Sequence, residues 1–429
     1  IQPKFVDFKN DLTFAETKSK LPLRYVKNNE NGLFELEFRY EFGREADNRY
    51  GVARDYMNYL GTDKLTSAEV KQKFYELACD CYVYEGNDNL TVMLYGLSEN
   101  MPAALELLED LWQNAKVDKA AYDQMVAKIL KQRDDAKKDQ RRYFNTLFQY
   151  GTYGKRNSST DVLSEQQLKE TDPQVLVDLL KNLKDYRHSV DYYGPMSVSE
   201  VSNIISKTHK TSRQLKEVPH GNPYVREQAT KDEVWIAPYD AKNIYMRMYH
   251  NEGRDWNPDE TATVSLFNEY FGGGMNGVVF QELREARGLA YNASAWYGRP
   301  SKIGEKESYF THIITQNDKM MDCIKEFHHI LNEFPASENA FKIAKEGLTK
   351  QLASLRVTKM NIISRWHSMQ KLGLNYDLNE KIYNDLKNVT LQDIVNFEKA
   401  NMANKAYRYL ILGDEKNLDM ESLEKIGPI

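Results

Sequence analysis

The sequence has few cysteines, no long apolar run and no large excess of charge of either sign. Three cysteines in 429 residues cannot form a disulfide framework, and Cys79 and Cys81 alternate as the core residues of a strand do. No apolar run approaches the roughly 18 residues of a membrane-spanning helix. The formal net charge of −5 gives no strong attraction to nucleic acid. These absences leave a globular protein, and its length favours at least two domains.

The chain is organised as a duplication. A predicted β-hairpin at Leu23–Phe42 has a counterpart at Glu233–Tyr249, and the predicted helix end Asn58–Gly61 has a counterpart at Glu269–Gly272. Each copy then contains one helix with apolar residues at helical spacing, which predicts packing against a core (Met101, Leu105, Leu108 and Trp112; Met320, Ile324, Phe327 and Leu331).

Helix starts and closing strands also recur at equivalent places. The predicted signals are a capping box for a helix at Ala68–Leu77 (Thr66 and Glu69), helix caps at Thr171 and Thr390, long helices that begin after Asp118 and Ser337, and last strands at Tyr186–Tyr193 and Ala406–Leu412.

The duplication predicts two domains and a linker. Residues 1–208 form the first predicted domain, the polar segment 209–232 is the linker, and residues 233–429 form the second domain. Each copy of about 200 residues predicts an α+β domain, a mostly antiparallel sheet with helices packed on one face. Side by side, two such domains form a crescent whose concave face can receive an extended peptide.

The stretch Leu266–Pro300 is the most distinctive part of the chain. Its pattern predicts a helix, three glycines at 272–274, a second helix at Val278–Arg287 and a strand after Gly288. The glycine triplet predicts either positive φ angles or the close approach of another backbone, and Gly288 stands where a helix C-cap is expected.

Within this stretch, GGGMNGVVFQELREARGLAY resembles the signature of the second domain in the pitrilysin and insulin-degrading-enzyme family, the inverted zincins that include the mitochondrial processing peptidases. The duplicated plan agrees with one half of a full family enzyme along essentially the whole chain. The resemblance implies two halves that face each other across a chamber. It also implies that the catalytic half binds zinc through H-x-x-E-H and a later Glu, with the Glu of the motif as general base.

The matching helix of this chain, GVARDYMNYLGT, lacks that motif. Val52 and Tyr56 occupy the positions of the two family histidines, Asp55 that of the general base and Gln132 that of the third ligand. Valine has no lone pair, and tyrosine and a neutral amide are poor zinc donors. We therefore expect no metal site and no catalytic residue in this chain, and zinc in a partner half. His329 and Glu333 are interpreted as part of a solvated helix face.

Arg284 and Tyr291 are the predicted substrate-binding residues. They match an Arg and a Tyr that, by the resemblance, reach across the chamber and bind the substrate carbonyl opposite the zinc. Preorganised donors of this kind stabilise the charge that develops on a carbonyl oxygen under attack. Taken alone, the two residues would be a surface ion-pair partner and a half-buried ring. Their place in the repeat, together with the lost zinc motif, favours the substrate-binding role.

The resemblance thus implies the non-catalytic half of a zinc metallopeptidase, either a subunit or the second half of a longer polypeptide. Its expected partners are an H-x-x-E-H half and a peptide substrate, and neither nucleic acid nor a membrane. Two alternatives stay open. One is a structural or assembly subunit, as the core proteins of the respiratory cytochrome bc1 complex are in this family; the other is a free-standing peptide-binding module. Because bacterial two-half relatives are often envelope proteins, the expected location is the bacterial periplasm or cell envelope.

Overall fold

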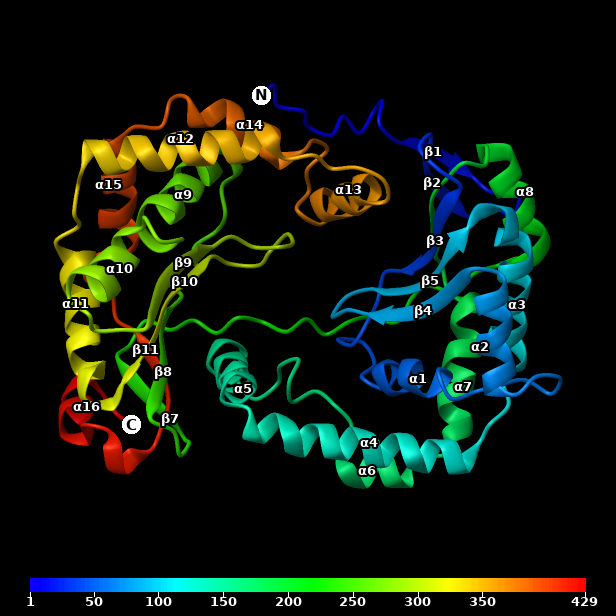
Figure 1. Ribbon diagram of the computed structural model, residues 1–429, viewed down its shortest axis with the longest axis horizontal. Helices are drawn as coiled ribbons and strands as arrows, with labels where there is room; N and C mark the ends of the chain where they lie inside the picture. Colours follow the sequence, from blue (N-terminus) through cyan, green and yellow to red (C-terminus); the bar gives the residue numbers. More distant parts are fainter.

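Two α+β units face each other in the computed structural model, which describes residues 1–429 (Figure 1). The first sheet comprises β1 (Thr13–Glu16), β2 (Pro22–Lys27), β3 (Leu33–Tyr40), β4 (Cys79–Glu85), β5 (Leu90–Leu97) and β6 (Ser189–Gly194), in the order β1-β2-β6-β3-β5-β4. The second comprises β7 (Glu233–Pro238), β8 (Asn243–His250), β9 (Asn292–Gly298), β10 (Ser308–Gln316) and β11 (Arg408–Gly413), in the order β7-β11-β8-β10-β9. The predicted α+β class, with mostly antiparallel pairing, is confirmed.

The predicted β-hairpins are wrong, although their strands form. The last strand of each copy separates the two strands of its predicted hairpin: β6 pairs parallel with β2 and antiparallel with β3, and β11 does the same with β7 and β8. Every residue of β6 and β11 is buried, as in a central strand. A two-residue hairpin turn would hold its strands as neighbours, whereas the longer connection Asn28–Gly32 leaves room for β6.

Apart from α5 (Gln140–Tyr153) and α13 (Asn361–Lys371), the helices of each copy cover one face of its sheet (Figure 1). The first copy has α1 (Tyr50–Met57), α2 (Ser67–Glu76), α3 (Met101–Asn114), α4 (Lys119–Lys138), α5 (Gln140–Tyr153), α6 (Glu165–Glu170), α7 (Pro173–Lys181) and α8 (Val198–Thr208). The second has α9 (Thr261–Phe267), α10 (Val278–Phe280), α11 (Met320–Asn332), α12 (Glu338–Ser354), α13 (Asn361–Lys371), α14 (Leu378–Leu386), α15 (Leu391–Asn401) and α16 (Met420–Ile426). The predicted apolar stripes of α3 and α11 are buried in the two cores. None of the helices has the length and apolarity needed to cross a membrane.

Most predicted helix caps are present. Thr66 and Glu69 form the capping box of α2, Thr390 caps α15, and Asp118 and Ser337 cap α4 and α12. The prediction for Thr171 is wrong by one residue. Asp172 caps α7, because its carboxylate accepts from the backbone of Gln174, while the Thr171 hydroxyl donates to the carbonyl of Gln167 at the end of α6.

The two copies exchange one helix each. Helix α5 lies on the second sheet, where Phe144 and Phe148 pack against Tyr245 and Phe310. Helix α13 lies on the first sheet, where the ring of Trp366 contacts Phe14, and His367 is 2.7 Å from the buried Asp191 carboxylate. Residues 1–208 and 233–429 therefore share packing surfaces, and their division into domains stays a prediction.

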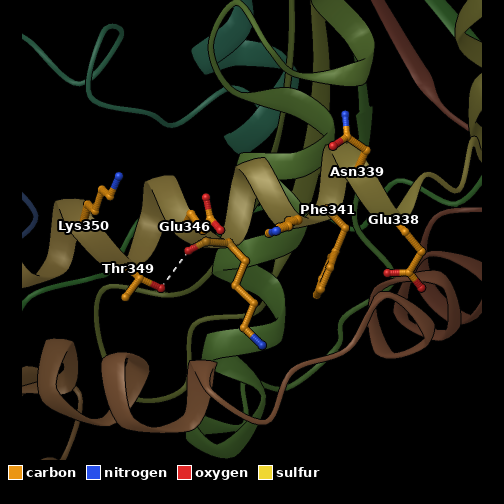
Figure 2. Close-up of a pocket in the computed structure, with 8 residues that line it drawn as sticks. Glu338, Asn339, Phe341, Glu346, Thr349 and Lys350 are labelled. Carbon is orange, nitrogen blue, oxygen red and sulfur yellow. Dashed lines mark hydrogen bonds between the residues drawn. The ribbon is translucent and has the colours of Figure 1, made fainter.

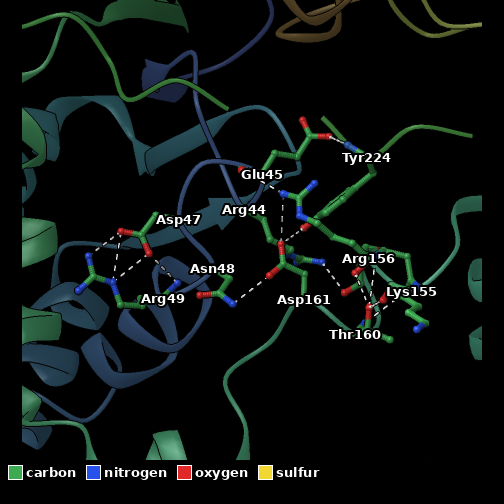
Figure 3. A network of polar contacts seen from close by, with 12 residues as sticks. Arg44, Glu45, Asp47, Asn48, Arg49, Lys155, Arg156, Thr160, Asp161 and Tyr224 are labelled. Carbon is green, nitrogen blue, oxygen red and sulfur yellow. Dashed lines mark hydrogen bonds and ion pairs between the residues drawn. The ribbon is translucent and has the colours of Figure 1, made fainter. Parts of the chain in front are cut away.

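The segment 209–232 packs between the two copies and is held there by side-chain contacts. Tyr224 is buried, its backbone N–H donates to Glu45 at 2.7 Å, and its hydroxyl donates to Asp161 at 2.6 Å (Figure 3). The guanidinium of Arg156 lies 4.6 Å from the centre of the Tyr224 ring. Lys302, in the loop between β9 and β10, is 3.7 Å from Glu45. This network holds parts of both copies against the segment.

Candidate functional site

Helix α1 carries the positions that the family resemblance assigns to zinc, and its side chains do not fit a metal. Val52 and Tyr56 are buried. The Tyr56 hydroxyl donates to the carbonyl of Asp118 at 2.8 Å and accepts from its N–H at 2.9 Å, so its oxygen is already bonded. Asp55 is 3.1 Å from Arg54. No group of three His, Cys, Asp or Glu side chains in the chain could hold a metal ion.

A cavity of about 490 Å³ lies at this position, between α1 and α4. Val52, Asp55 and Gln132 line it, so the structure brings together three of the four altered positions. Four arginines also line it: Arg44, Arg54, Arg133 and Arg142. Three carboxylates line it as well, and each is paired with an arginine: Glu85 with Arg44, Asp55 with Arg54 and Asp161 with Arg156. With its acids engaged in this way, the cavity offers no set of side chains for a divalent cation.

The glycine-rich stretch adopts the backbone that the sequence predicts. Gly274 has φ +72° and Gly288 has φ +59°. A Cβ atom at Gly272 would collide with the carbonyl oxygen of Ala295 in β9, so the second reason for glycine, close approach, applies there. The N–H groups of Gly288 and Leu289 donate to the carbonyls of Arg284 and Leu283, which completes a C-cap after the second helix.

Two π-helical segments flank the glycines, which the sequence pattern does not predict. They span Asn268–Gly272, directly after α9, and Gln281–Ala286, directly after α10. The hydrogen bonds of a π-helix span one residue more than those of an α-helix, and such segments are frequent at functional sites. Asn268 uses its side-chain amide to bond both the N–H and the carbonyl of Tyr297 at 2.9 Å, which fixes the first segment to β9.

Arg284 and Tyr291 lie at the two ends of the C-cap and both are exposed. Arg284 belongs to the second π-helical segment; its guanidinium lies 4.9 Å from the centre of the Phe280 ring and 3.9 Å from Glu285. Tyr291 directly precedes β9 and is 53% exposed, and its hydroxyl accepts from the Gln316 side chain at 2.7 Å. Neither side chain bonds the other. Each is oriented by its own neighbours, and both leave donor hydrogens free.

His329 and Glu333 form a contact at the protein surface. His329 Nδ1 is 3.5 Å from Glu333 Oε2, and both side chains are at least half exposed. This agrees with the interpretation as a solvated helix face.

A second large cavity, of about 690 Å³, lies in the second copy, and sequence reasoning did not find it. It is bounded by α9, β9, α12 and α13, and its lining includes Trp296, Arg299 and Glu307. Burial raises the pKa of Glu307 to about 7, although the neighbouring Arg254 opposes that shift. The residues that form this cavity are spread from position 256 to position 382, and no local pattern links them.

A further hollow of about 670 Å³ lies along α12 (Figure 2). All of its lining residues belong to that single helix, so it is a groove beside a helix and not an enclosed site. One of its lysines, Lys345, donates to the carbonyl of Val389 at 2.8 Å. This contact ties α12 to the connection after α14.

The structure is a duplicated α+β unit, and no group of His, Cys, Asp or Glu side chains in it can hold a metal ion. Residues 189–348 match the family profile of the peptidase M16 inactive domain. The zinc protease YmxG of Bacillus subtilis is 21% identical over 368 residues, which cover 79% of this chain and 82% of YmxG. A zinc protease of Rickettsia felis is 21% identical over 388 residues, which cover 85% and 87%. Residues 189–348 thus match a peptidase M16 inactive domain, and most of the chain is similar to these two zinc proteases.

Solved structures share the fold along nearly the whole chain. A peptidase M16 inactive domain from Pseudomonas fluorescens superposes with a TM-score of 0.70 at 15% identity, and the match covers 94% of this chain and 98% of that one. The periplasmic protease PqqL of Escherichia coli gives 0.73 at 11% identity, and the ferredoxin protease FusC, in complex with Arabidopsis ferredoxin, gives 0.72 at 9%. The matches cover 97% and 96% of this chain but 46% of each protease. The chain thus spans about half the length of these two proteases.

Proposed function

We propose that this chain is the non-catalytic half of a two-half zinc peptidase, either as a separate subunit or as the second half of a longer polypeptide. A partner half supplies the H-x-x-E-H motif, the third ligand and the zinc. This chain forms one wall of the chamber, and Arg284 and Tyr291 bind the carbonyl of the peptide bond that is cleaved.

The observation that carries this proposal is a complementary pair of changes. The cavity beside Val52 and Gln132 contains no group of side chains that could hold a metal ion. Arg284 and Tyr291, in contrast, are exposed and available. The match of residues 189–348 to the M16 inactive domain and the match of the chain to about half of PqqL and of FusC support the same division.

The chemistry follows from what the two side chains can donate. Negative charge develops on the oxygen of a peptide carbonyl as it is attacked. Arg284 offers guanidinium hydrogens and a charge that does not titrate near neutral pH. The Tyr291 oxygen already accepts from Gln316, which leaves its own hydrogen to donate to the substrate oxygen. Gln316 is therefore a positioning residue.

A mixing experiment tests this function. The full chain and a catalytic half, identified by H-x-x-E-H in the adjoining sequence or reading frame, are purified separately, and cleavage of a quenched fluorogenic peptide is measured. We expect no cleavage by this chain alone and a kcat/KM for the equimolar mixture about 100-fold above that of the catalytic half alone. If the two proteins associate but the mixture is no faster than the catalytic half, the chain is a structural subunit.

A further inference from the structure

The cavity of about 690 Å³ in the second copy contains an arginine without a counter-ion. Arg299 follows β9 and is partly buried. The pKa of Arg299 is lowered by burial and then by the positive charge of Arg365, and no carboxylate opposes the shift. The cost of holding a cation in such a place is reduced only by an anion.

The other charged groups that line this cavity do not serve Arg299. Arg365 is 2.8 Å from Asp377, and Lys371 is 2.9 Å from Asp88 of the first copy. Glu307 is 3.2 Å from Arg254. Glu269, the remaining acid in the lining, makes no ion pair with Arg299. Arg299 is thus the one lining arginine whose charge is not used within the chain.

Ten of the 24 residues that line the cavity are hydrophobic. Trp256, Leu352 and Met369 are among them, and Trp296, which precedes Arg299 by three positions in the chain, is 52% exposed. A volume near 690 Å³ is in the range of ligand pockets, and an apolar wall with a few placed polar groups is their usual composition. A ligand that suits the cavity has an apolar part and one anionic group.

The cavity of the second copy corresponds to the cavity beside α1 in the first copy. The helix start at Asp118 corresponds to that at Ser337, so Gln132 of α4 corresponds to Gln351 of α12. Gln132 lines the first cavity and Gln351 lines the second. The two cavities are therefore equivalent positions of the two copies. The first is lined by four arginines and three acids, whereas the second is lined by two arginines, of which Arg299 has no ion-pair partner.

We propose that the cavity around Arg299 binds a peptide segment, with a peptide carboxylate on the Arg299 guanidinium and an adjacent apolar side chain on Trp296. The carboxylate is either the C-terminal one or that of an acidic side chain. This proposal rests on the proposed function, since it names the class of peptide that the non-catalytic half holds, but it uses different residues from Arg284 and Tyr291.

Fluorescence anisotropy with three labelled peptides tests the proposal on the isolated full chain. The first peptide ends in Ala-Leu-Phe with a free carboxylate, the second is its C-terminal amide, and the third is the amide with Glu replacing Ala. We expect at least one carboxylate peptide to bind about 10-fold or more tightly than the neutral amide. The free-terminus and Glu peptides distinguish the two sources of the carboxylate. Arg299→Gln should remove the preference, whereas Arg187→Gln, at an exposed ion pair with Glu217, should not.

Thermal unfolding provides a second measurement that does not depend on a ligand. Because Arg299 is a partly buried cation without a counter-ion, Arg299→Gln should leave Tm unchanged or raise it. Equal binding of neutral and carboxylate peptides, a preference that survives Arg299→Gln, or a fall in Tm of several degrees would each overturn the proposal. Anisotropy on the isolated chain measures peptide binding and does not depend on cleavage. Loss of the pocket therefore appears in anisotropy, while failure of the proposed function appears only in cleavage by the mixture.

Discussion

Arg284→Ala is expected to lower kcat/KM of the mixture with a catalytic half by about 100-fold or more, the effect of removing one preorganised donor from an oxyanion site. The guanidinium is exposed and lies 3.9 Å from its nearest carboxylate, so alanine removes little packing and no strong ion pair. The loss should fall on the chemical step. Steady-state cleavage of a fluorogenic peptide, fitted for kcat and KM separately, measures it.

Two matched variants make this result specific. Arg287→Ala, in the same turn, removes a guanidinium 3.2 Å from Glu326 and should change kcat/KM by less than about 2-fold. Tyr291→Phe keeps the ring and removes the hydroxyl, so it should reduce kcat/KM without unfolding the chain. If both donors act on one oxygen, their effects should not be additive in the double variant. Equal losses in Arg284→Ala and Arg287→Ala would indicate general disruption of the helix instead.

Glu109→Gln is expected to cause the largest loss of stability, about 3 to 5 kcal/mol in the free energy of unfolding. Glu109 of α3 is buried, with Lys184 Nζ at 2.8 Å on one oxygen and His209 Nδ1 donating to the other. His209 Nε2 is 2.8 Å from His188 Nε2. The His188 Nδ1 hydrogen is donated to the carbonyl of Tyr186, so His188 accepts from His209. Removing the carboxylate charge leaves the buried Lys184 ammonium without an anion.

The stability that the Glu109 carboxylate contributes should decrease at low pH, because its contacts lower its pKa. Burial alone would raise the pKa of Glu109, but the hydrogen bond from His209 and the charge of Lys184 lower it below the ordinary 4.5. The stabilisation from this carboxylate is therefore complete above pH 4.5 and is lost as the pH falls through the lower folded-state value. Burial and His209 lower the pKa of His188 to about 3, so His188 stays neutral over this range.

Urea unfolding at pH 7 and at several values below 4.5 measures this prediction. The difference between the parent chain and Glu109→Gln should shrink as the pH falls. Glu106→Gln, at an exposed position of the same helix, should stay within about 0.5 kcal/mol of the parent at every pH. A Glu109→Gln cost that does not change with pH would show that shape, and not charge, determines the effect.

Much of the fold can be predicted from the sequence because it depends on local periodicity. The stripe of Met101, Leu105 and Leu108, the capping box of Thr66 and the C-cap at Gly288 each involve residues within a few positions of one another. Such patterns fix helices and strands without knowledge of the tertiary structure.

The strand pairing and the helix exchange could not be predicted because they depend on contacts between distant residues. β6 reaches the gap between β2 and β3 only after about 150 intervening residues. The His367–Asp191 contact joins residues 176 positions apart. A sequence signal existed only in β11, where the continuous apolar run Tyr409–Leu412 is typical of a central strand.

Part of the candidate site could be predicted from the sequence, and part could not. The family resemblance of the glycine-rich stretch singles out Arg284 and Tyr291, and the structure places both at exposed positions. Their action on a substrate stays a prediction. Arg299 has no local pattern of its own. Only the tertiary structure shows that Arg299 lines a cavity together with Trp296 and Arg365.

The central claim is that the metal belongs to the partner and the carbonyl donors to this chain. Zinc content, measured by mass spectrometry of metals after gel filtration, tests it most directly. The isolated chain should contain no bound zinc, whereas the equimolar complex with the catalytic half should contain one zinc and cleave peptides. Stoichiometric zinc in the isolated chain, together with unaided peptide cleavage, would contradict the account.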